Sequence, residues 1–575
     1  MTKKDGSSKK VDRKRSAKSE SLAPKKPKIE ELLKQWDELD KQEEKKSPET
    51  KDDPAGVDLS RSCPYLDTIN RNMLDFDFEK LCSISLSHLN VYACLVCGKY
   101  FQAGSSCDFF GRGSNTHAHT HSVNENHHVF LNLETHRFYC LPDNYEIVDG
   151  SLEDITYLLN PIFQKDDITK LDTNASMVRA YNGLTYYPGF VGLNNIKVKF
   201  FILCLKTNLS ANDYCNVILQ LLSHISLLRD FFLRPENYQE QIKRAAAGDH
   251  MTLLVHRFGE LIRKLWNPRN FKTHVSPHEF LQAVVLCSKK RFQFTEQGDA
   301  LEFLSWLLNA LDQTLKPASK GQAVKPTIIG RALRGRMVIH SQKVTPVNIT
   351  PEQAEQYATD PEYMPRVTES PFLYLTCDLP PPPLYLDEFK ESIIPQVPLS
   401  TLLAKFNGIT EKEYKTHCDS TMRRFCLKRL PPYLILFMKR IVKNIFTLEK
   451  NPTIVNFPIK SIDFGELLDQ EARAQHKYTI YDLVANVVHD GPPTPGAGTH
   501  RIFVLQRGTG KWFEMQDLHV NEVLPQMIPL SESLIQVWAV NKTIQNPFYK
   551  SKATKKTNEG TANENEDHKE AGKET

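Results

Sequence analysis

The chain has 575 residues, of which 40% are hydrophobic, 25% are charged and 12 are cysteines, and its formal net charge is +4. This length corresponds to about three or four average domains, and the ordinary composition predicts that most of the chain folds. The longest apolar run, at 198–205, is much shorter than the ~20 residues that span a bilayer, so we expect no membrane segment. The polar start MTKKDGSSKK predicts no secretory signal. The cysteines therefore belong to a reducing compartment, where they act as metal ligands, nucleophiles or core residues.

Residues 1–62 are predicted to be a disordered basic segment. Within 1–30 there are eleven Lys or Arg, four Asp or Glu and no aromatic residue, so this part cannot bury enough apolar surface to fold. Its basic clusters at 9–10, 13–15 and 25–28 resemble a bipartite nuclear-import signal, which predicts localisation in the nucleus. The alternative is a solvated polycationic tail that contacts RNA.

The next segment, 63–165, carries a metal-binding pattern. Cys94 and Cys97 form a CxxC, in which a tight turn brings both sulfurs to one side, and a dense group of histidines follows: His117, His119, His121, His127 and His128. Two thiolates and two imidazoles satisfy tetrahedral zinc. Because the protein would fill all four positions, we predict that the zinc is structural.

Residues 185–542 are predicted to form an α+β domain. Helical stretches are expected at 253–268, 278–289 and 298–315, and strands at 433–440, 481–489 and 501–506. Residues 543–575 are polar and poor in apolar side chains, so we expect a second disordered tail.

Longer motifs in the finger segment resemble a known family. The stretches CPYLDTINRNMLDFDFEKLCSISLSHLNVYACLVCGKYFQ and GRGSNTHAHTHSV are similar to the UBP-type zinc finger of ubiquitin-specific proteases. This resemblance implies Cys94, Cys97, His121 and His127 as zinc ligands, with His117 as a rival ligand. Members of this finger type bind the C-terminal Gly-Gly of ubiquitin. We identify no aromatic stacking residue for that pocket, so the resemblance leaves at most weak binding of ubiquitin or a ubiquitin-like protein.

The larger segment resembles the catalytic domain of the same proteases, which has a papain-like fold. Its landmarks occur in the family's order: GLNN (192–195), NDYCNVILQ (212–220), QGDALEFL (297–304), LPPYLILFMKR (430–440), YDLVANVVHDG (481–491) and KWFEMQDLHV (511–520). The resemblance implies a zinc finger followed by a ubiquitin-specific-protease fold. Two stretches, 103–110 and 198–210, interrupt the family's motifs. We hypothesise that they are retained introns or gene-model errors, with a lineage-specific loop as the alternative.

Aligned on these motifs, all three catalytic positions carry other residues. Asp213 occupies the position of the nucleophilic cysteine, Thr499 that of the base histidine, and Gln516 that of the orienting Asp or Asn. Cys215 lies two residues further along a helix, a rotation of ~200°, so we expect its thiol to point away from the cleft. His500 follows Thr499 on a strand whose neighbouring side chains face opposite sides. We therefore expect that His500 cannot take the base position without a register slip.

These substitutions predict a pseudoenzyme without catalytic residues. Within the family, the resemblance is closest to the inactive branch of the spliceosomal tri-snRNP. It implies a nuclear, non-catalytic role in pre-mRNA splicing, in which the protein supports tri-snRNP assembly or stability through contacts with its proteins and snRNAs.

Two other functions stay open. One is an active deubiquitinase in which Cys215 acts with His500 or His489 in an unusual geometry. The other is RNA binding through the basic tail. The folded segments show no basic platform with interleaved aromatic residues that would bind RNA bases.

Overall fold

The structure, a computed structural model, describes residues 63–550 except for 104–115, 174, 203–204, 244–249, 294–295, 317–324, 346–356, 358, 382–393, 416–419, 444–446 and 495–496. The predicted basic segment 1–62 and most of the predicted C-terminal tail lie outside the described residues. Among the helices that the structure describes, none is both long enough and apolar enough to cross a membrane.

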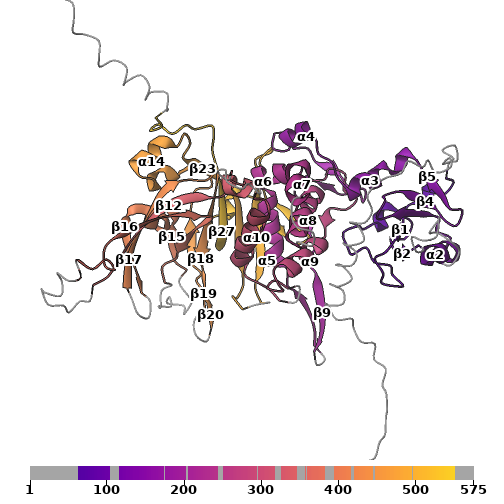
Figure 1. Cartoon of the computed structure of the whole chain (residues 1–575), viewed down its shortest axis with the longest axis horizontal. Helices are drawn as coiled ribbons and strands as arrows, with labels where there is room; N and C mark the ends of the chain where they lie inside the picture. Colours follow the sequence, from indigo (N-terminus) through magenta and orange to yellow (C-terminus); the bar gives the residue numbers. More distant parts are fainter. Residues whose placement is uncertain are drawn as a thin grey trace, which may run out of the picture. The chain divides into compact units, whose positions relative to one another are not determined.

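The finger segment folds around a five-stranded antiparallel sheet with strand order β2-β1-β3-β4-β5 (Figure 1). Its strands are β1 (Val91–Cys94), β2 (Tyr100–Gln102), β3 (Val129–Asn132), β4 (Phe138–Cys140) and β5 (Tyr145–Ile147), and helix α2 spans His117–Glu125. Short helices precede and follow the sheet: η1 (Leu66–Thr68), η2 (Arg71–Met73), η3 (Gly150–Leu152), α3 (Glu153–Leu159) and α4 (Lys165–Lys170). All four residues of β1 and of β3 are buried, because the sheet is covered on both faces.

The protease-like segment begins with a helical part: α5 (Asp213–Ser223), α6 (Ser226–Phe232), α7 (Glu236–Lys243), α8 (His250–Leu265), α9 (His278–Cys287), α10 (Ala300–Thr314) and α11 (Ile328–Ala332). Helices α8, α9 and α10 confirm the three predicted helices to within a few residues. Every residue of α5 is buried, which makes this helix the centre of the largest apolar core.

An eight-stranded sheet packs against α5. Its path is β14-β18-β27-β23-β24-β25-β26, with β22 paired to β23, and only the β14–β18 pair is parallel. The strands are β14 (Tyr374–Asp378), β18 (Tyr433–Lys439), β22 (Ile462–Asp463), β23 (Ile480–Asp490), β24 (Thr499–Gln506), β25 (Lys511–Gln516), β26 (His519–Val523) and β27 (Ser533–Val540). Strands β18, β23 and β24 confirm the three predicted strands.

A separate four-stranded antiparallel sheet has the order β13-β12-β17-β16, and Figure 1 shows β12, β17 and β16 side by side. Its strands are β12 (Gly335–Lys343), β13 (Arg366–Phe372), β16 (Asn407–Lys415) and β17 (Ser420–Arg429). Helices α13 (Leu399–Leu403) and η4 (Ala404–Phe406) and one end of this sheet share a second apolar core that includes Phe406 and Leu427.

The remaining elements are short: β6 (Val178–Arg179), β7 (Thr185–Tyr186), β8 (Gly192–Leu193), β11 (His274–Val275), β15 (Gln396–Pro398), β19 (Ile441–Lys443), β20 (Leu448–Lys450), β21 (Ile454–Asn456), η5 (Phe464–Leu467), α14 (Gln470–Gln475) and η6 (Pro525–Met527). The described residues of the interrupting stretch 198–210 fall in a two-stranded ribbon, β9 (Lys197–Ile202) with β10 (Leu205–Ser210), and among the described strands these two pair only with each other.

The C-terminal end of the domain extends further than the sequence predicted. Residues 543–550 pack on α14 instead of beginning a tail, because the Asn546 side chain donates to the carbonyls of Arg473 and His476. The Arg473 guanidinium also lies over the ring of Phe548 at 4.2 Å from its centroid.

Candidate metal centre and degenerate protease site

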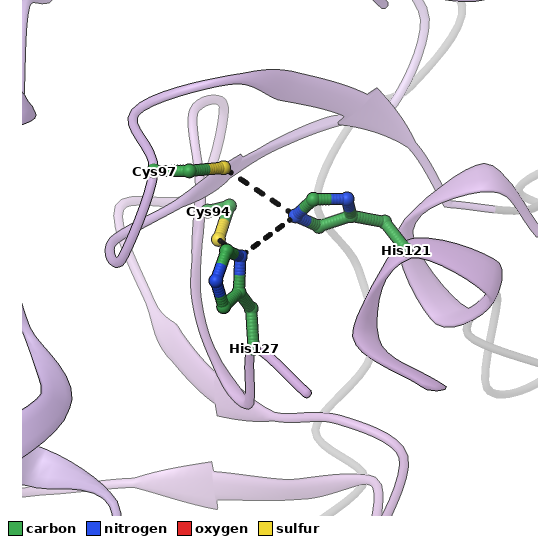
Figure 2. Close-up of side chains that lie close together, drawn as sticks. All are labelled: Cys94, Cys97, His121 and His127. Carbon is green, nitrogen blue, oxygen red and sulfur yellow. Dashed lines mark hydrogen bonds between the residues drawn. The ribbon is translucent and has the colours of Figure 1, made fainter. Parts of the chain in front are cut away.

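Four side chains of the finger converge on one point (Figure 2). Cys94 ends β1, Cys97 lies in the turn that follows, His121 lies on α2 and His127 precedes β3. The distances are 3.4 Å from Cys97 Sγ to His121 Nε2, 3.1 Å from His121 Nε2 to His127 Nδ1, and 3.6 Å from Cys94 Sγ to His127 Nδ1. These ligand atoms all lie within 4.8 Å of one another, so the cluster can hold one metal ion.

A tight backbone turn holds the two cysteines of the CxxC close together. The N–H of Gly98 donates to the carbonyl of Cys94 at 2.9 Å, and Gly98 has a φ of +73°. A side chain at this position would collide with the carbonyl oxygen of Met73, so only glycine fits the turn. The hydrogen bond between the two thiols lowers the pKa of Cys97 and raises the pKa of Cys94, so it favours a thiolate at only one of the two positions.

His117, the rival ligand, does not reach this cluster. Its Nδ1 lies 3.4 Å from Sγ of Cys82, a buried cysteine outside the CxxC. His128 is likewise engaged elsewhere, with Nδ1 2.8 Å from the carbonyl oxygen of Leu141. His121 instead stacks on Phe101 with ring centroids 4.1 Å apart, which holds its imidazole toward the two sulfurs.

The protease-like site centres on Asp213, the first residue of α5. Its Oδ2 accepts two hydrogen bonds of 2.8 Å from His500, one from the backbone N–H and one from Nδ1. His500 thus contacts Asp213, although strand alternation predicted that it could not take the base position. Neighbouring side chains of β24 do alternate, with Thr499 exposed and His500 buried, but the Asp213 carboxylate also turns inward and meets His500 there.

Gln297, which lies in a family motif, also donates hydrogen bonds to this carboxylate. Its Nε2 lies 2.8 Å from both carboxylate oxygens of Asp213 and 3.1 Å from the carbonyl oxygen of Gly498. Although burial alone raises it, the pKa of Asp213 is lowered on balance by the hydrogen bonds from His500 and Gln297. The first residue of α5 is therefore a buried, ionised carboxylate that accepts several hydrogen bonds.

A second histidine lies beside this pair. The rings of His489 and His500 are 4.8 Å apart at a steep angle. Burial, assisted by the nearby charge of His500, lowers the pKa of His489 to about 4, so it is neutral at physiological pH. His489 Nδ1 is buried and finds no hydrogen-bond partner among the described residues.

The structure also places the other residues that the sequence singled out. Cys215 is buried in the main core, and burial raises the pKa of its thiol well above the usual range, which confirms that it points away from any cleft. Gln516 is half-buried at the end of β25. The sequence reasoning missed the role of Asp517, which accepts hydrogen bonds of 3.0 and 2.9 Å from the amides of Asn195 and Asn216. Asn195, Asn216 and Asp517 each lie within one of the family motifs, and this position is the sequence signal that could have identified them.

Comparison with known proteins bears on both parts of the chain. Residues 82–152 match the family model described as "Zn-finger in ubiquitin-hydrolases and other protein", and residues 204–551 match "Ubiquitin carboxyl-terminal hydrolase". The first match identifies the finger as a zinc finger. The second begins inside the β9–β10 ribbon, so it leaves out the GLNN motif at 192–195.

Three individual proteins show how far the similarity extends. The chain is 59% identical to mouse (Mus musculus) "Ubiquitin carboxyl-terminal hydrolase 39" over 479 residues, covering 83% of this chain and 80% of the relative. It is 42% identical to "Probable mRNA-splicing protein ubp10" of Schizosaccharomyces pombe, covering 82% and 88%. The solved structure "Crystal structure of an essential yeast splicing factor" is 27% identical, with a TM-score of 0.59, and the match covers 83% of this chain and all of that one. The chain therefore belongs to the ubiquitin carboxyl-terminal hydrolase family.

Proposed function

We propose that this protein is a non-catalytic factor of pre-mRNA splicing that uses a zinc finger and a protease-like domain as binding scaffolds. The observation that carries the proposal is the Asp213–His500 pair. A carboxylate that accepts hydrogen bonds from His500 and Gln297 replaces the thiolate at the start of α5, and this arrangement supplies no nucleophile for an isopeptide bond.

The names of two relatives support the splicing assignment. One protein that is 42% identical is named as an mRNA-splicing protein, and the solved structure is titled as that of a splicing factor. We infer that the chain acts in the nucleus and that its partners are proteins and snRNAs of the tri-snRNP. The family resemblance also supports domain limits of 63–165 for the finger and 185–542 for the protease-like domain, the latter now extended to 550 by the packing on α14.

Within the finger, we propose that Cys94, Cys97, His121 and His127 are the ligands of one structural zinc. Four protein ligands would complete the tetrahedral coordination that structural zinc prefers and leave no position for water or substrate. The position of His117, which faces Cys82, supports leaving this residue out of the proposed set.

The test of the proposed function is purification of the full-length protein from nuclear extract, followed by identification of the RNAs and proteins that accompany it. We expect tri-snRNP proteins and snRNAs. A preparation without snRNP components would contradict the splicing assignment. As a matched comparison, a variant that lacks the finger ligands (Cys94→Ser with Cys97→Ser) separates partners held by the finger from those held by the protease-like domain.

The alternative of an active deubiquitinase makes a different prediction. A ubiquitin probe with an electrophilic C-terminus would form a covalent adduct with Cys215 if that cysteine were the nucleophile. We expect no adduct, since Cys215 is buried in the core. An adduct that disappears in Cys215→Ala would overturn the assignment as a pseudoenzyme.

A further inference from the structure

The four-stranded sheet carries basic side chains on both faces, but it places the carboxylates of its strands on one face only. In the register of the sheet, Arg423 of β17 lies opposite Lys412 of β16 on one side and opposite Ser341 of β12 on the other. Ser341 in turn lies opposite Arg366 of β13. Because opposite residues of paired strands project to the same side, Arg366, Arg423 and Lys412 form a row across one face.

The glutamates of these strands lie on the other face. On β16, Glu411 and Glu413 each lie one residue from Lys412, so their side chains project to the opposite side of the sheet. On β13, Glu369 lies opposite Val338 of β12 and projects to that same second face. On that second face they meet cations, as Arg336 does with Glu369 and Lys415 with Glu413. The four strands, all of whose residues are described, thus leave the first face without a carboxylate of their own.

Aromatic rings lie between the cations of this face. Tyr414 is two residues beyond Lys412 on β16 and shares its side of the sheet, and the Arg423 guanidinium lies 5.1 Å from the centroid of the Tyr414 ring. The Tyr414 ring contacts Phe425 at 6.1 Å, and the ammonium of Lys405 lies 5.6 Å from the Phe425 centroid. Cations and rings therefore alternate along the face.

Part of the positive charge on this face is compensated from outside the sheet. Asp378 pairs with Lys405 and Lys412 at 2.8 Å, and Glu362 pairs with Lys343 at 3.2 Å. Arg366 and Arg423 are exposed, and neither makes an ion pair with a described residue. These two arginines are the charges available to a ligand.

We propose that this face, defined by Arg366, Arg423, Lys412, Tyr414 and Phe425, binds single-stranded RNA. Arginines neutralise phosphates, and half-exposed aromatic rings stack on unpaired bases, which is the combination that RNA-binding sheets use. An acidic polypeptide needs the cations but has no use for the rings, so RNA is the better match. The sequence analysis found no such platform, because its residues come from three strands, β13, β16 and β17, and meet only through the register of the sheet.

Binding of the full-length protein to a twelve-nucleotide oligouridylate, measured by fluorescence anisotropy over a range of salt concentrations, tests the proposal. We expect the double variant Arg366→Glu/Arg423→Glu to bind at least tenfold more weakly and to lower the slope of log K against log salt by about 1.4, or about 0.7 for each lost phosphate contact. The matched control is Arg336→Glu/Arg424→Glu, which makes the same charge change on the opposite face of the same sheet and should leave the slope nearly unchanged. Tyr414→Leu should weaken binding about tenfold through lost stacking, with little change in slope.

A cross-linking experiment separates this face from the basic segment 1–62, which is present in every variant. With 4-thiouridine in the oligonucleotide, we expect cross-linked peptides that contain Tyr414 or Phe425. The proposal is wrong if the two double variants bind equally and cross-links occur only within 1–62. It is also wrong if a polyglutamate peptide binds as tightly as the RNA and Tyr414→Leu has no effect, which would identify an acidic protein partner. Neither result depends on whether the protein acts in splicing.

Discussion

The imidazole of His500 and the carboxylate of Asp213 form a buried hydrogen bond of 2.8 Å, and both side chains are 6% exposed. The two side chains thus join the start of α5 to the start of β24 in the interior of the protein.

We predict that Asp213→Asn destabilises the protein by about 2 kcal/mol. The amide cannot offer two anionic acceptors to His500 and Gln297, and it leaves buried donors poorly paired. Chemical denaturation of the full chain measures the effect, with the exposed Asp67→Asn as the control. Equal stability of the two variants would show that the pair contributes nothing to folding.

The buried, neutral His489 predicts a dependence of stability on pH. Its pKa is about 4 in the folded protein, against about 6.5 in an unfolded chain, so between these values the unfolded state binds more protons. Stability should therefore fall as the pH is lowered from about 6.5 to 4, by up to ~3 kcal/mol from this group. The pKa of Asp213 is lower in the folded protein than in an unfolded chain, so this carboxylate stabilises the fold at pH values above the unfolded-chain pKa. That contribution is lost only in stronger acid, as the pH falls toward the pKa of the folded state.

Replacing His489 with Gln should flatten this pH profile relative to the wild type, while the exposed His519→Gln should leave it unchanged. Thermal unfolding at a series of pH values between 4 and 8 gives the comparison. Since the finger is the same in all three proteins, loss of its metal at low pH cancels in the difference. Parallel profiles for all three would mean that His489 has the same pKa in the folded and unfolded states.

The metal content of finger variants distinguishes the four clustered ligands from His117. Cys97→Ser and His121→Ala should abolish binding of one zinc per chain and unfold the finger, because a structural zinc contributes on the order of 10 kcal/mol to folding. His117→Ala should retain the metal. Elemental analysis of the purified variants decides the point, and loss of zinc from His117→Ala would return this residue to the ligand set.

Cys215 should be inert in the native protein. Burial raises the pKa of its thiol and keeps alkylating reagents out, so iodoacetamide should modify it only after denaturation. Half-buried Cys426 provides an internal comparison in the same mass-spectrometric digest. Rapid labelling of Cys215 in the native state would revive the possibility that it acts as a nucleophile.

The sequence alone was sufficient wherever chemistry depends on residue type and local spacing. The CxxC with its downstream histidines predicted the metal cluster, helix periodicity placed α8, α9 and α10, and the helical phase of residues 213 and 215 correctly directed Cys215 into the core. The helices and the CxxC turn are local features, since each is set within a few turns of helix or one tight turn.

The tertiary structure alone decided which distant side chains meet. Strand alternation correctly turned His500 inward, but it could not show that the carboxylate of Asp213, 287 residues away, turns inward as well. Likewise, the row of Arg366, Arg423 and Lys412 exists only through the register of three strand pairs. Register and helix-to-sheet packing are set by the burial of whole faces, and that information is spread over the chain rather than held in any one motif.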